Sequence, residues 1–332
     1  MMRRLAPTAF ALLIGVLTFA RADAKGPEAC RGEDLTQVEG LAAAEAKRAD
    51  DLVNAEGLLW RIEKPSLPPS YLYGTIHSTD DSAMEVAQRA AREIKGAKVV
   101  ATELGGPFDS IEKANIGAAM LAKALDRDHD TFEGVVAPED SELIEKFLAG
   151  QGYPNQFAHH LKLWFLSVLT ALPSCEAKRE ALDLPEVDQF LAQTATDAGV
   201  KVIGLETPQE QLDVIATMRP EVAATLLTLA AREPGMNDDV YATMLRLYRE
   251  SRPAEILPIA DVVGGLSEAE RAAQDEFMRV LLLDRNAVMA ERAAPLLASG
   301  GAFIAVGALH LSGKDGLVER FRTQGYKVTK VW

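Results

Sequence analysis

Residues 300–310 read GGAFIAVGALH, and this stretch decides the fold. Residues 302–306 form a short continuous apolar run behind two glycines, which is typical of a strand buried on both faces of a sheet. The run ends in a glycine, and His310 follows three residues after it. An earlier segment, YLYGTIH at residues 71–77, has the same form and ends in His77. We therefore predict a fold in which two strands deliver histidines just beyond their ends.

Two further short apolar strands are predicted to end in carboxylates. Residues 98–102 (KVVAT) lead to Glu103, and residues 201–205 (KVIGL) lead to Glu206. A helical pattern precedes each strand, and this order of strand, helix and strand indicates an α/β fold, with α+β as the alternative. Ligands of open α/β sheets bind outside the carboxyl ends of the strands. We therefore expect both carboxylates to meet the two histidines there.

The rest of the chain is predicted to surround this sheet. Residues 58–62 and 71–76 flank a proline-rich loop and predict a hairpin, and residues 326–332 predict a final strand. The pattern from about 110 to 198 is mostly helical, which indicates a helical insertion. We predict a central mixed sheet flanked by helices, with a site at the strand ends, in one domain that spans residues 25–332.

The composition is that of a globular protein with an acidic surface. The chain has 332 residues, of which 48% are hydrophobic, so it is long enough to bury a full core. With 35 basic and 49 acidic residues, its formal net charge is -14. Such a charge repels phosphate backbones and anionic lipid surfaces. We therefore expect no nucleic-acid partner, and nothing in the composition indicates the oligomeric state.

The N-terminus has the pattern of a secretory signal. A short basic start precedes an apolar stretch at residues 9–20 and small residues at 22–24, so residues 1–24 are predicted to be a signal peptide. We expect a periplasmic or secreted protein. An uncleaved anchor stays open, because Arg21 and Asp23 crowd the cleavage site. No later stretch reaches the roughly 18 uninterrupted apolar residues of a span, so no stable membrane span is expected in the mature chain.

The mature chain contains two cysteines, Cys30 and Cys175. Their spacing has no metal-ligand signature. In an oxidising compartment disulfides persist, so the two residues can form a staple between the N-terminal segment and the middle of the chain. Two unpaired buried thiols are the alternative, and the sequence leaves both open.

The two strand-end histidines each belong to a Gly-x-x-His segment, at residues 74–77 and 307–310, and the glycines have a physical role there. Gly74 and Gly307 allow the chain to turn tightly, or to approach a neighbour closely, just before each histidine. The protein holds only five histidines, so two copies of this pattern, each after a strand, are informative. The other three have no such lead-in, and we interpret them as ordinary surface or packing residues: His129, His159 and His160.

Several segments, taken in order, resemble the motifs of the TraB/GumN (Tiki-like) family. The similarity spans nearly all of the mature chain. The matching segments are GLLWRI at 57–62, YGTIH at 73–77, GLET at 204–207, Arg285-Asn286, VGALHL at 306–311 and GKDGL at 313–317.

This resemblance implies a fold similar to that of erythromycin esterase-like and ChaN-like proteins, and a divalent-metal peptidase of the Tiki type. It places His77, His310 and Glu103 at the metal. Imidazoles with a carboxylate suit manganese, cobalt or zinc and leave a position for water. The chain lacks a His-Glu-x-x-His helix, so it is not a zincin by motif.

The resemblance also assigns supporting roles to three residues. Glu206 is implied as a nearby acid–base or supporting carboxylate, and Arg285 with Asn286 as the groups that hold substrate or a developing oxyanion. Ordinary explanations stay open for two of them. Glu206 lies where it can cap the next helix, and Arg285 lies beside Asp284, with which it can form a surface ion pair.

Three functions are compatible with these residues. The first is a secreted metal-dependent hydrolase acting on peptide or protein substrates. The second keeps the pocket but uses His77 as a general base in a metal-independent, esterase-like hydrolysis. The third is a non-catalytic periplasmic protein that binds a peptide or a haem.

Overall fold

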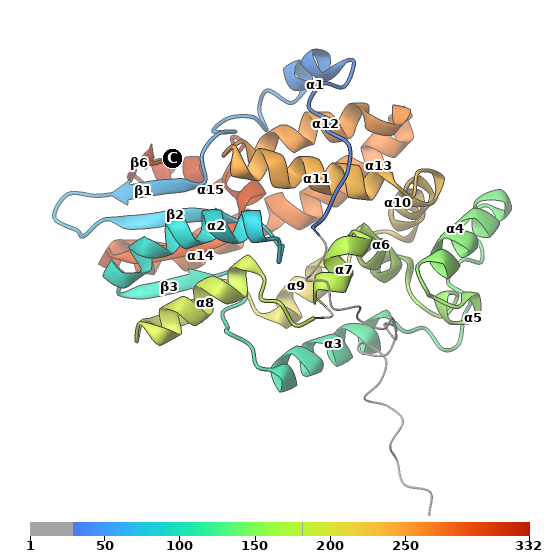
Figure 1. The fold of residues 1–332 in the computed structure, drawn as a ribbon, viewed down its shortest axis with the longest axis horizontal. Coiled ribbons are helices and arrows are strands. Elements are labelled where there is room, and N and C mark those ends of the chain that lie inside the picture. The colour runs from blue at the N-terminus through green and yellow to red at the C-terminus, as the bar shows by residue number, and fades with distance from the viewer. Residues whose placement is uncertain (1–28, 181) are drawn as a thin grey trace, which may run out of the picture.

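The computed structural model describes residues 29–180 and 182–332 (Figure 1). The predicted signal peptide, residues 1–24, lies outside the described residues. One sheet has the strand order β4-β3-β5-β2-β1-β6. Its strands are β1 (Leu59–Glu63), β2 (Ser70–Thr75), β3 (Val99–Thr102), β4 (Lys201–Gly204), β5 (Ala302–Gly307) and β6 (Lys327–Lys330).

The sheet is mixed, and its parallel part carries the candidate site. β4, β3, β5 and β2 are parallel neighbours, whereas β1 is antiparallel to both β2 and β6. The predicted hairpin of residues 58–62 and 71–76 is thus confirmed as β1 and β2. Because the four parallel strands run in one direction, their carboxyl ends lie at the same edge. The predicted α/β class with a mixed sheet flanked by helices is confirmed.

Helices cover the sheet and form a separate block beside it (Figure 1). The longer helices are α2 (Asp81–Ala90), α3 (Ser110–Ala124), α4 (Pro138–Gly150), α6 (Leu163–Ala171), α8 (Val187–Asp197), α9 (Pro208–Ile215), α10 (Pro220–Arg232), α11 (Met236–Arg249), α13 (Glu268–Met278) and α14 (Asp284–Ser299). The shorter ones are α1 (Leu41–Lys47), α5 (Asn155–Ala158), α7 (Ser174–Glu180), α12 (Ile256–Val262) and α15 (Leu317–Thr323). A π-helical turn, η4 (Arg279–Leu283), precedes α14; the 3-10 turns are η1 (Ala91–Gly96), η2 (Pro253–Glu255), η3 (Val263–Gly265) and η5 (Ala308–His310).

The central strand β5 buries both of its faces, as its apolar sequence predicts. Phe303 and Ala305 point into an apolar cluster with helices α2, α8 and α11. Ile304 and Val306 point the other way, into a cluster with α14 and α15. Successive side chains of a strand alternate between faces, so one apolar run serves both layers. The sheet is therefore the middle layer of three.

The helical block has an apolar core of its own. This core joins α4 and α6 with α10 and α13, and Figure 1 shows α4 and α5 at the end of the molecule away from the β1–β2 hairpin. The predicted insertion of residues 110–198 ends in α8, whose Val187, Leu191 and Ala195 instead pack on the sheet. The predicted boundaries of the domain and of the insertion stay predictions.

Gly74 allows the two Gly-x-x-His segments to pack against each other. A side chain at Gly74 would place its Cβ 2.9 Å from both Cα and Cβ of Ala308, the residue after the second glycine. A Cβ at Gly307 would lie 3.1 Å from Glu103 Oε1. The predicted reason for these glycines, close approach to a neighbour, is confirmed at Gly74. The ends of β2 and β5 thus lie in direct contact.

Cys30 and Cys175 form a disulfide, with a Cα–Cα distance of 5.3 Å. Of the two pairing states left open by the sequence, the staple is the one that the structure has. Among the described residues, no single helix is long and apolar enough to cross a membrane, although α9 and α10 pass this test together across an 87° bend.

We predict that Gly74→Ala destabilises the protein by about 1–3 kcal/mol, because the added methyl group meets backbone that cannot move away freely. The matched control is Gly96→Ala, where a Cβ would meet nothing within 4 Å. The control is expected to change the free energy of unfolding by less than about 1 kcal/mol. Urea denaturation measures both values. Equal stabilities for the two variants would contradict the role given to Gly74.

Candidate functional site

The four residues expected beyond the strand ends all lie at the same edge of the sheet. Glu103 directly follows β3, Glu206 lies two residues beyond β4, and His77 two residues beyond β2. His310 is the last residue of η5, which follows β5. The carboxylates and His310 are buried, whereas the His77 side chain is 65% exposed. The site therefore has a buried part and an accessible part.

A buried arginine joins the two carboxylates. Arg285 Nη2 donates to Glu103 Oε2 at 2.5 Å and to Glu206 Oε2 at 2.6 Å, and Arg285 Nε donates to both oxygens of Glu206 at 3.0 and 3.1 Å. Arg285 Nη1 donates to the carbonyl oxygen of Leu281 at 3.0 Å. A guanidinium with fixed donor directions can hold two carboxylates that would otherwise repel each other. All three nitrogens of Arg285 are thereby engaged.

The structure excludes the ordinary explanations for Glu206 and Arg285. Helix α9 is capped by Thr207, whose side chain accepts from the backbone N–H of Glu210, so Glu206 is not the cap. Asp284 pairs with Arg279 instead of Arg285. The alternative of a surface ion pair between Arg285 and Asp284 is therefore wrong. Arg285 is the second residue of α14, which directly follows the π-helical turn η4. Such π-helical turns occur frequently at functional sites.

Asn286 orients the buried histidine. Its Oδ1 lies 2.7 Å from His310 Nδ1, while its Nδ2 donates to the carbonyl oxygen of Asp315 at 3.2 Å. Since the amide oxygen is an acceptor, His310 Nδ1 carries the proton. Burial lowers the pKa of His310 to about 4, so its imidazole is neutral at pH 7. The lone pair of Nε2 then faces Glu103.

Glu103 is held as an anion. Burial alone would raise the pKa of Glu103, but its interactions with His310 and with the Arg285 guanidinium lower it to about 2. Glu103 Oε1 accepts from the Gly307 N–H at 2.7 Å, and Oε2 accepts from Gln211 Nε2 at 3.2 Å. Glu103 Oε1 lies 3.7 Å from His310 Nε2, which is too long for a hydrogen bond. His310 Nε2 and Glu103 Oε1 are thus two acceptors that face each other, and a proton donor or a cation between them would satisfy both.

The accessible part of the site groups His77 with two carboxylates from the start of α8. His77 Nδ1 lies 3.5 Å from Asp188 Oδ2 and 3.8 Å from Glu186 Oε2. One ligand atom from each of the three lies within 4.8 Å of the others, and this is the one such group of three among the described residues. Thr75 Oγ1 donates to Asp188 Oδ1 at 3.0 Å. One imidazole and two carboxylates form a donor set that suits a divalent cation.

The charges in this group depend on one another. The desolvation that surrounding protein imposes would lower the pKa of His77, but the nearby carboxylates of Asp188 and Glu186 hold it well above its usual value. Burial raises the pKa of Asp188, although His77 opposes this. The charge of Glu103 acts on both His77 and Asp188. The buried and accessible parts therefore share one electrostatic environment.

The structure regroups the residues predicted for the metal. Glu103 and His310 face each other, whereas His77 is grouped with Glu186 and Asp188. Neither of these carboxylates was predicted from the sequence. Acidic residues at the start of a helix are common because they complement its dipole, so the sequence offered no distinguishing signal. The catalytic and metal-binding roles themselves stay predictions.

The remaining histidines lie in the helical block or on its loops. His159 stacks on Phe132 and lies 2.9 Å from the carboxylate of Asp130. His129 and His160 are exposed, and their Nδ1 atoms contact oxygens of Asp126. They have the surface and packing contacts expected of them.

We predict that Arg285→Met destabilises the protein by roughly 3–5 kcal/mol, because two carboxylates are left buried without their cation. The matched control is Arg219→Met, which removes an equivalent two-nitrogen contact to Glu276 from a side chain that is 62% exposed. Because exposed ion pairs contribute little, this change is expected to leave the free energy of unfolding nearly unchanged. Thermal and urea unfolding compare them. A small effect of Arg285→Met would show that the buried ion pairs are not required.

We also predict a specific acid sensitivity. Because the pKa of His310 is about 4 in the folded protein and about 6.5 when unfolded, the unfolded chain binds an extra proton between these values. Stability is therefore lost as pH falls from about 6.5 to 4, by on the order of 3 kcal/mol from this residue. Urea unfolding in EDTA at several pH values measures the slope. His310→Gln is expected to reduce it, and an unchanged slope would contradict the lowered pKa.

The comparisons with known proteins bear on the resemblance seen in the motifs. A family model described as the TraB/PrgY/gumN family matches residues 58–330. Neither the comparison with curated proteins nor the comparison with solved structures found a match. The matched range begins just before β1 and ends with β6, so it contains the whole sheet and every residue of the site. The chain belongs to the TraB/PrgY/gumN family.

Proposed function

We propose that this protein is a secreted or periplasmic metal-dependent hydrolase that acts on peptide bonds. His77, Glu186 and Asp188 would hold the ion, which we expect to be manganese, cobalt or zinc. The hydrolysis of peptides is what the motif resemblance implies, and the disulfide is compatible with secretion. The donor set at His77 supports the metal, and the facing pair of His310 and Glu103 supports the hydrolysis.

One observation carries this proposal. Asp188 Oδ2 is buried and accepts no hydrogen bond of normal geometry from the part of the chain that the structure describes. Buried carboxylate oxygens are normally satisfied, because an unpaired one costs free energy. The oxygen lies beside His77 Nδ1 and in ligand range of Glu186. A bound cation would satisfy it and would explain the position of all three side chains.

The residues around the proposed ion would have different roles. Thr75 fixes one oxygen of Asp188 and leaves the other available. When bound, the ion would acidify a water molecule and polarise the substrate carbonyl. The exposed side chain of His77 lies where a substrate can approach. Placing donors on strand ends and on the first turn of a packed helix keeps such a site rigid.

His310 and Glu103 would take up and release a proton during the proposed hydrolysis. His310 Nε2 and Glu103 Oε1 are both acceptors, and a proton taken up between them lies at Nε2 with the carboxylate as its counterion. Asn286 Oδ1 accepts from Nδ1–H and therefore keeps the imidazole oriented in both protonation states. Arg285 keeps Glu103 ionised. Acid–base catalysis by a positioned side chain of this kind contributes about 10²–10⁴-fold in rate.

A second candidate, metal-independent hydrolysis with His77 as the base, is favoured by the contact between His77 and Asp188. This resembles the histidine–carboxylate pair of many hydrolases. However, the nearby carboxylates raise the pKa of His77 well above its usual value, which favours the protonated imidazole, a poor base, in the absence of a metal. A metal-independent enzyme would therefore gain activity only as pH rises through that pKa.

We predict that the protein binds Mn²⁺, Co²⁺ or Zn²⁺ and that Asp188→Asn weakens binding by at least about tenfold, because the neutral amide lacks the anionic oxygen that would bind the ion. Calorimetric titration of the chelator-treated protein measures the affinity. His77→Ala is expected to weaken binding similarly. The matched control is His129→Ala, which changes a histidine–aspartate contact on the surface and should leave binding unchanged.

Activity is measured on a peptide library with each metal and with EDTA. The proposal expects cleavage that requires metal and is lost in His77→Ala. Cleavage that survives EDTA and increases at alkaline pH would replace it with the metal-independent hydrolase. Metal binding with every peptide left intact would instead indicate a binding protein, and a haem Soret band on titration would identify haem as its ligand.

A further inference from the structure

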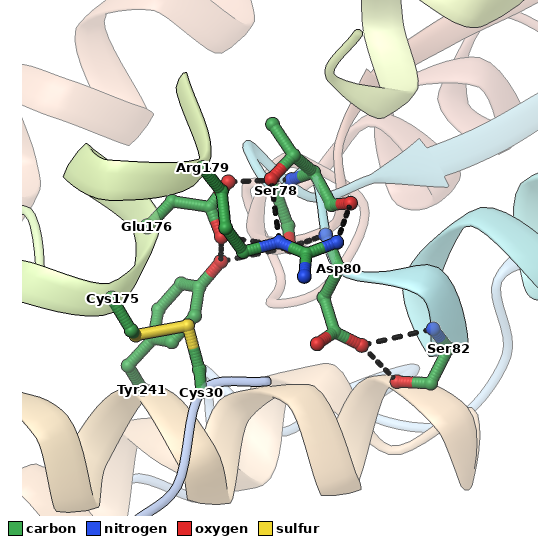
Figure 2. Close-up of a disulfide and its surroundings, with 9 residues drawn as sticks. Cys30, Ser78, Asp80, Ser82, Cys175, Glu176, Arg179 and Tyr241 are labelled. Atoms are coloured by element: carbon green, nitrogen blue, oxygen red, sulfur yellow. Dashed lines mark hydrogen bonds between the residues drawn. A yellow bond between two sulfur atoms is a disulfide. The ribbon is translucent and has the colours of Figure 1, made fainter. Parts of the chain in front are cut away.

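The turn that follows His77 is polar and yet buried. Ser78, Thr79 and Asp80 are 0%, 4% and 8% exposed, respectively. Buried polar groups need hydrogen-bond partners, and a turn cannot provide all of these within itself. Many of its partners come from α7 and α11, which are far away in the sequence. Figure 2 shows these helices around the turn, next to the disulfide.

Glu176 on α7 is the acceptor around which this turn is arranged. It is wholly buried, and its Oε1 accepts from the backbone N–H of Thr79 at 2.6 Å. Its Oε2 accepts from Tyr241 OH at 2.6 Å, and Ser78 Oγ lies 3.5 Å away (Figure 2). A buried carboxylate is favourable only when donors surround it, so these contacts fix the carboxylate and the turn together.

Arg179, one helical turn further along α7, holds the other side of the same residue. Its Nη2 donates to the carbonyl oxygen of Thr79 at 2.7 Å, and its Nε donates to Thr79 Oγ1 at 3.0 Å. Thr79 therefore has its N–H and its C=O bonded to side chains of one short helix. The backbone two residues after His77 cannot shift without breaking these bonds.

The same turn also fixes the two carboxylates proposed as ligands. The backbone N–H of Val187 donates to the carbonyl oxygen of Ser78 at 3.1 Å. Val187 lies between Glu186 and Asp188 at the start of α8. The turn is thus bonded to the chain on both sides of the proposed ion: directly to His77, and through Val187 to the carboxylates.

The disulfide holds α7 in place. Helix α7 has seven residues, and helices of this length are marginal on their own in water. Cys175, next to Glu176, is bonded to Cys30 in the N-terminal segment. That segment is docked on α11, where Glu33 N–H donates to Asp239 at 2.6 Å. The helix that carries Glu176 is therefore bonded covalently to the N-terminal segment, which in turn is hydrogen-bonded to α11.

We infer that Glu176 is a positioning residue for the His77 side of the site: it holds the turn of residues 78–80 so that His77, Glu186 and Asp188 face one another. The Cys30–Cys175 disulfide keeps Glu176 at this position. This inference deepens the proposed function and rests on it for the identity of the ligand. The arrangement of the turn itself is independent of any ligand.

The test uses the full mature chain with Glu176→Ala and two readouts. In the chelator-treated protein, hydrogen exchange at the Thr79 amide is expected to accelerate about tenfold or more, with the amides of β5 unchanged, because its buried acceptor is lost. The affinity for Mn²⁺, measured by titration, is expected to fall at least about tenfold, as when groups that orient metal ligands are removed. Glu176→Gln, which keeps an acceptor oxygen, is expected to restore both values largely.

The matched control is Glu145→Ala, which removes another hydrogen-bonded glutamate, in the helical block. It should change neither readout. If Glu176→Ala does not fold, the Cys30→Ser/Cys175→Ser double variant is measured instead, with the same direction expected for both readouts. Unchanged exchange at Thr79 and unchanged Mn²⁺ affinity in the folded variant would overturn the inference. If the wild-type protein binds none of Mn²⁺, Co²⁺ and Zn²⁺, the proposed function fails, and exchange at Thr79 still decides whether Glu176 holds the turn.

Discussion

The guanidinium of Arg285 is the contact on which the buried part of the site depends. It stands between Glu103 and Glu206, which follow two neighbouring strands and would repel each other if left alone. Water cannot screen these charges, because all three side chains are buried. One cation with fixed donor directions makes the arrangement possible. It also links the sheet edge to the π-helical turn before α14, so the helix, both strands and the site form one unit.

The site has two parts with different physical character. In the buried part, Asn286, Arg285 and the Gly307 amide already satisfy most of the donors and acceptors, which gives His310 and Glu103 defined protonation states. In the accessible part, His77 is exposed and one oxygen of Asp188 has no partner among the described residues. Ligand binding is favoured where fixed polar groups, as in the buried part, lie beside side chains with unsatisfied ligand atoms, as around His77.

Much of the framework was predictable from local patterns. Short apolar runs predict strands, and parallel strands with intervening helices place their carboxyl ends at one edge, so His77, Glu103, Glu206 and His310 were expected there. Glu186 and Asp188 were not predicted. Acidic residues in the first turn of a helix have an ordinary explanation, and nothing in their spacing distinguishes them from residues that only complement the helix dipole.

The sequence by itself determined where the strands lie, where glycine precedes each strand-end histidine, and which family the chain resembles. Each of these features depends on a short, contiguous sequence pattern. Only the tertiary structure decided which groups are partners. Glu206 pairs with Arg285 across 79 residues instead of capping the adjacent helix, and Glu176 reaches Thr79 across 97. The physical reason is that periodicity reports which face of an element is buried, whereas a hydrogen bond depends on how separate elements pack. Whether two cysteines 145 residues apart meet was decided in the same way.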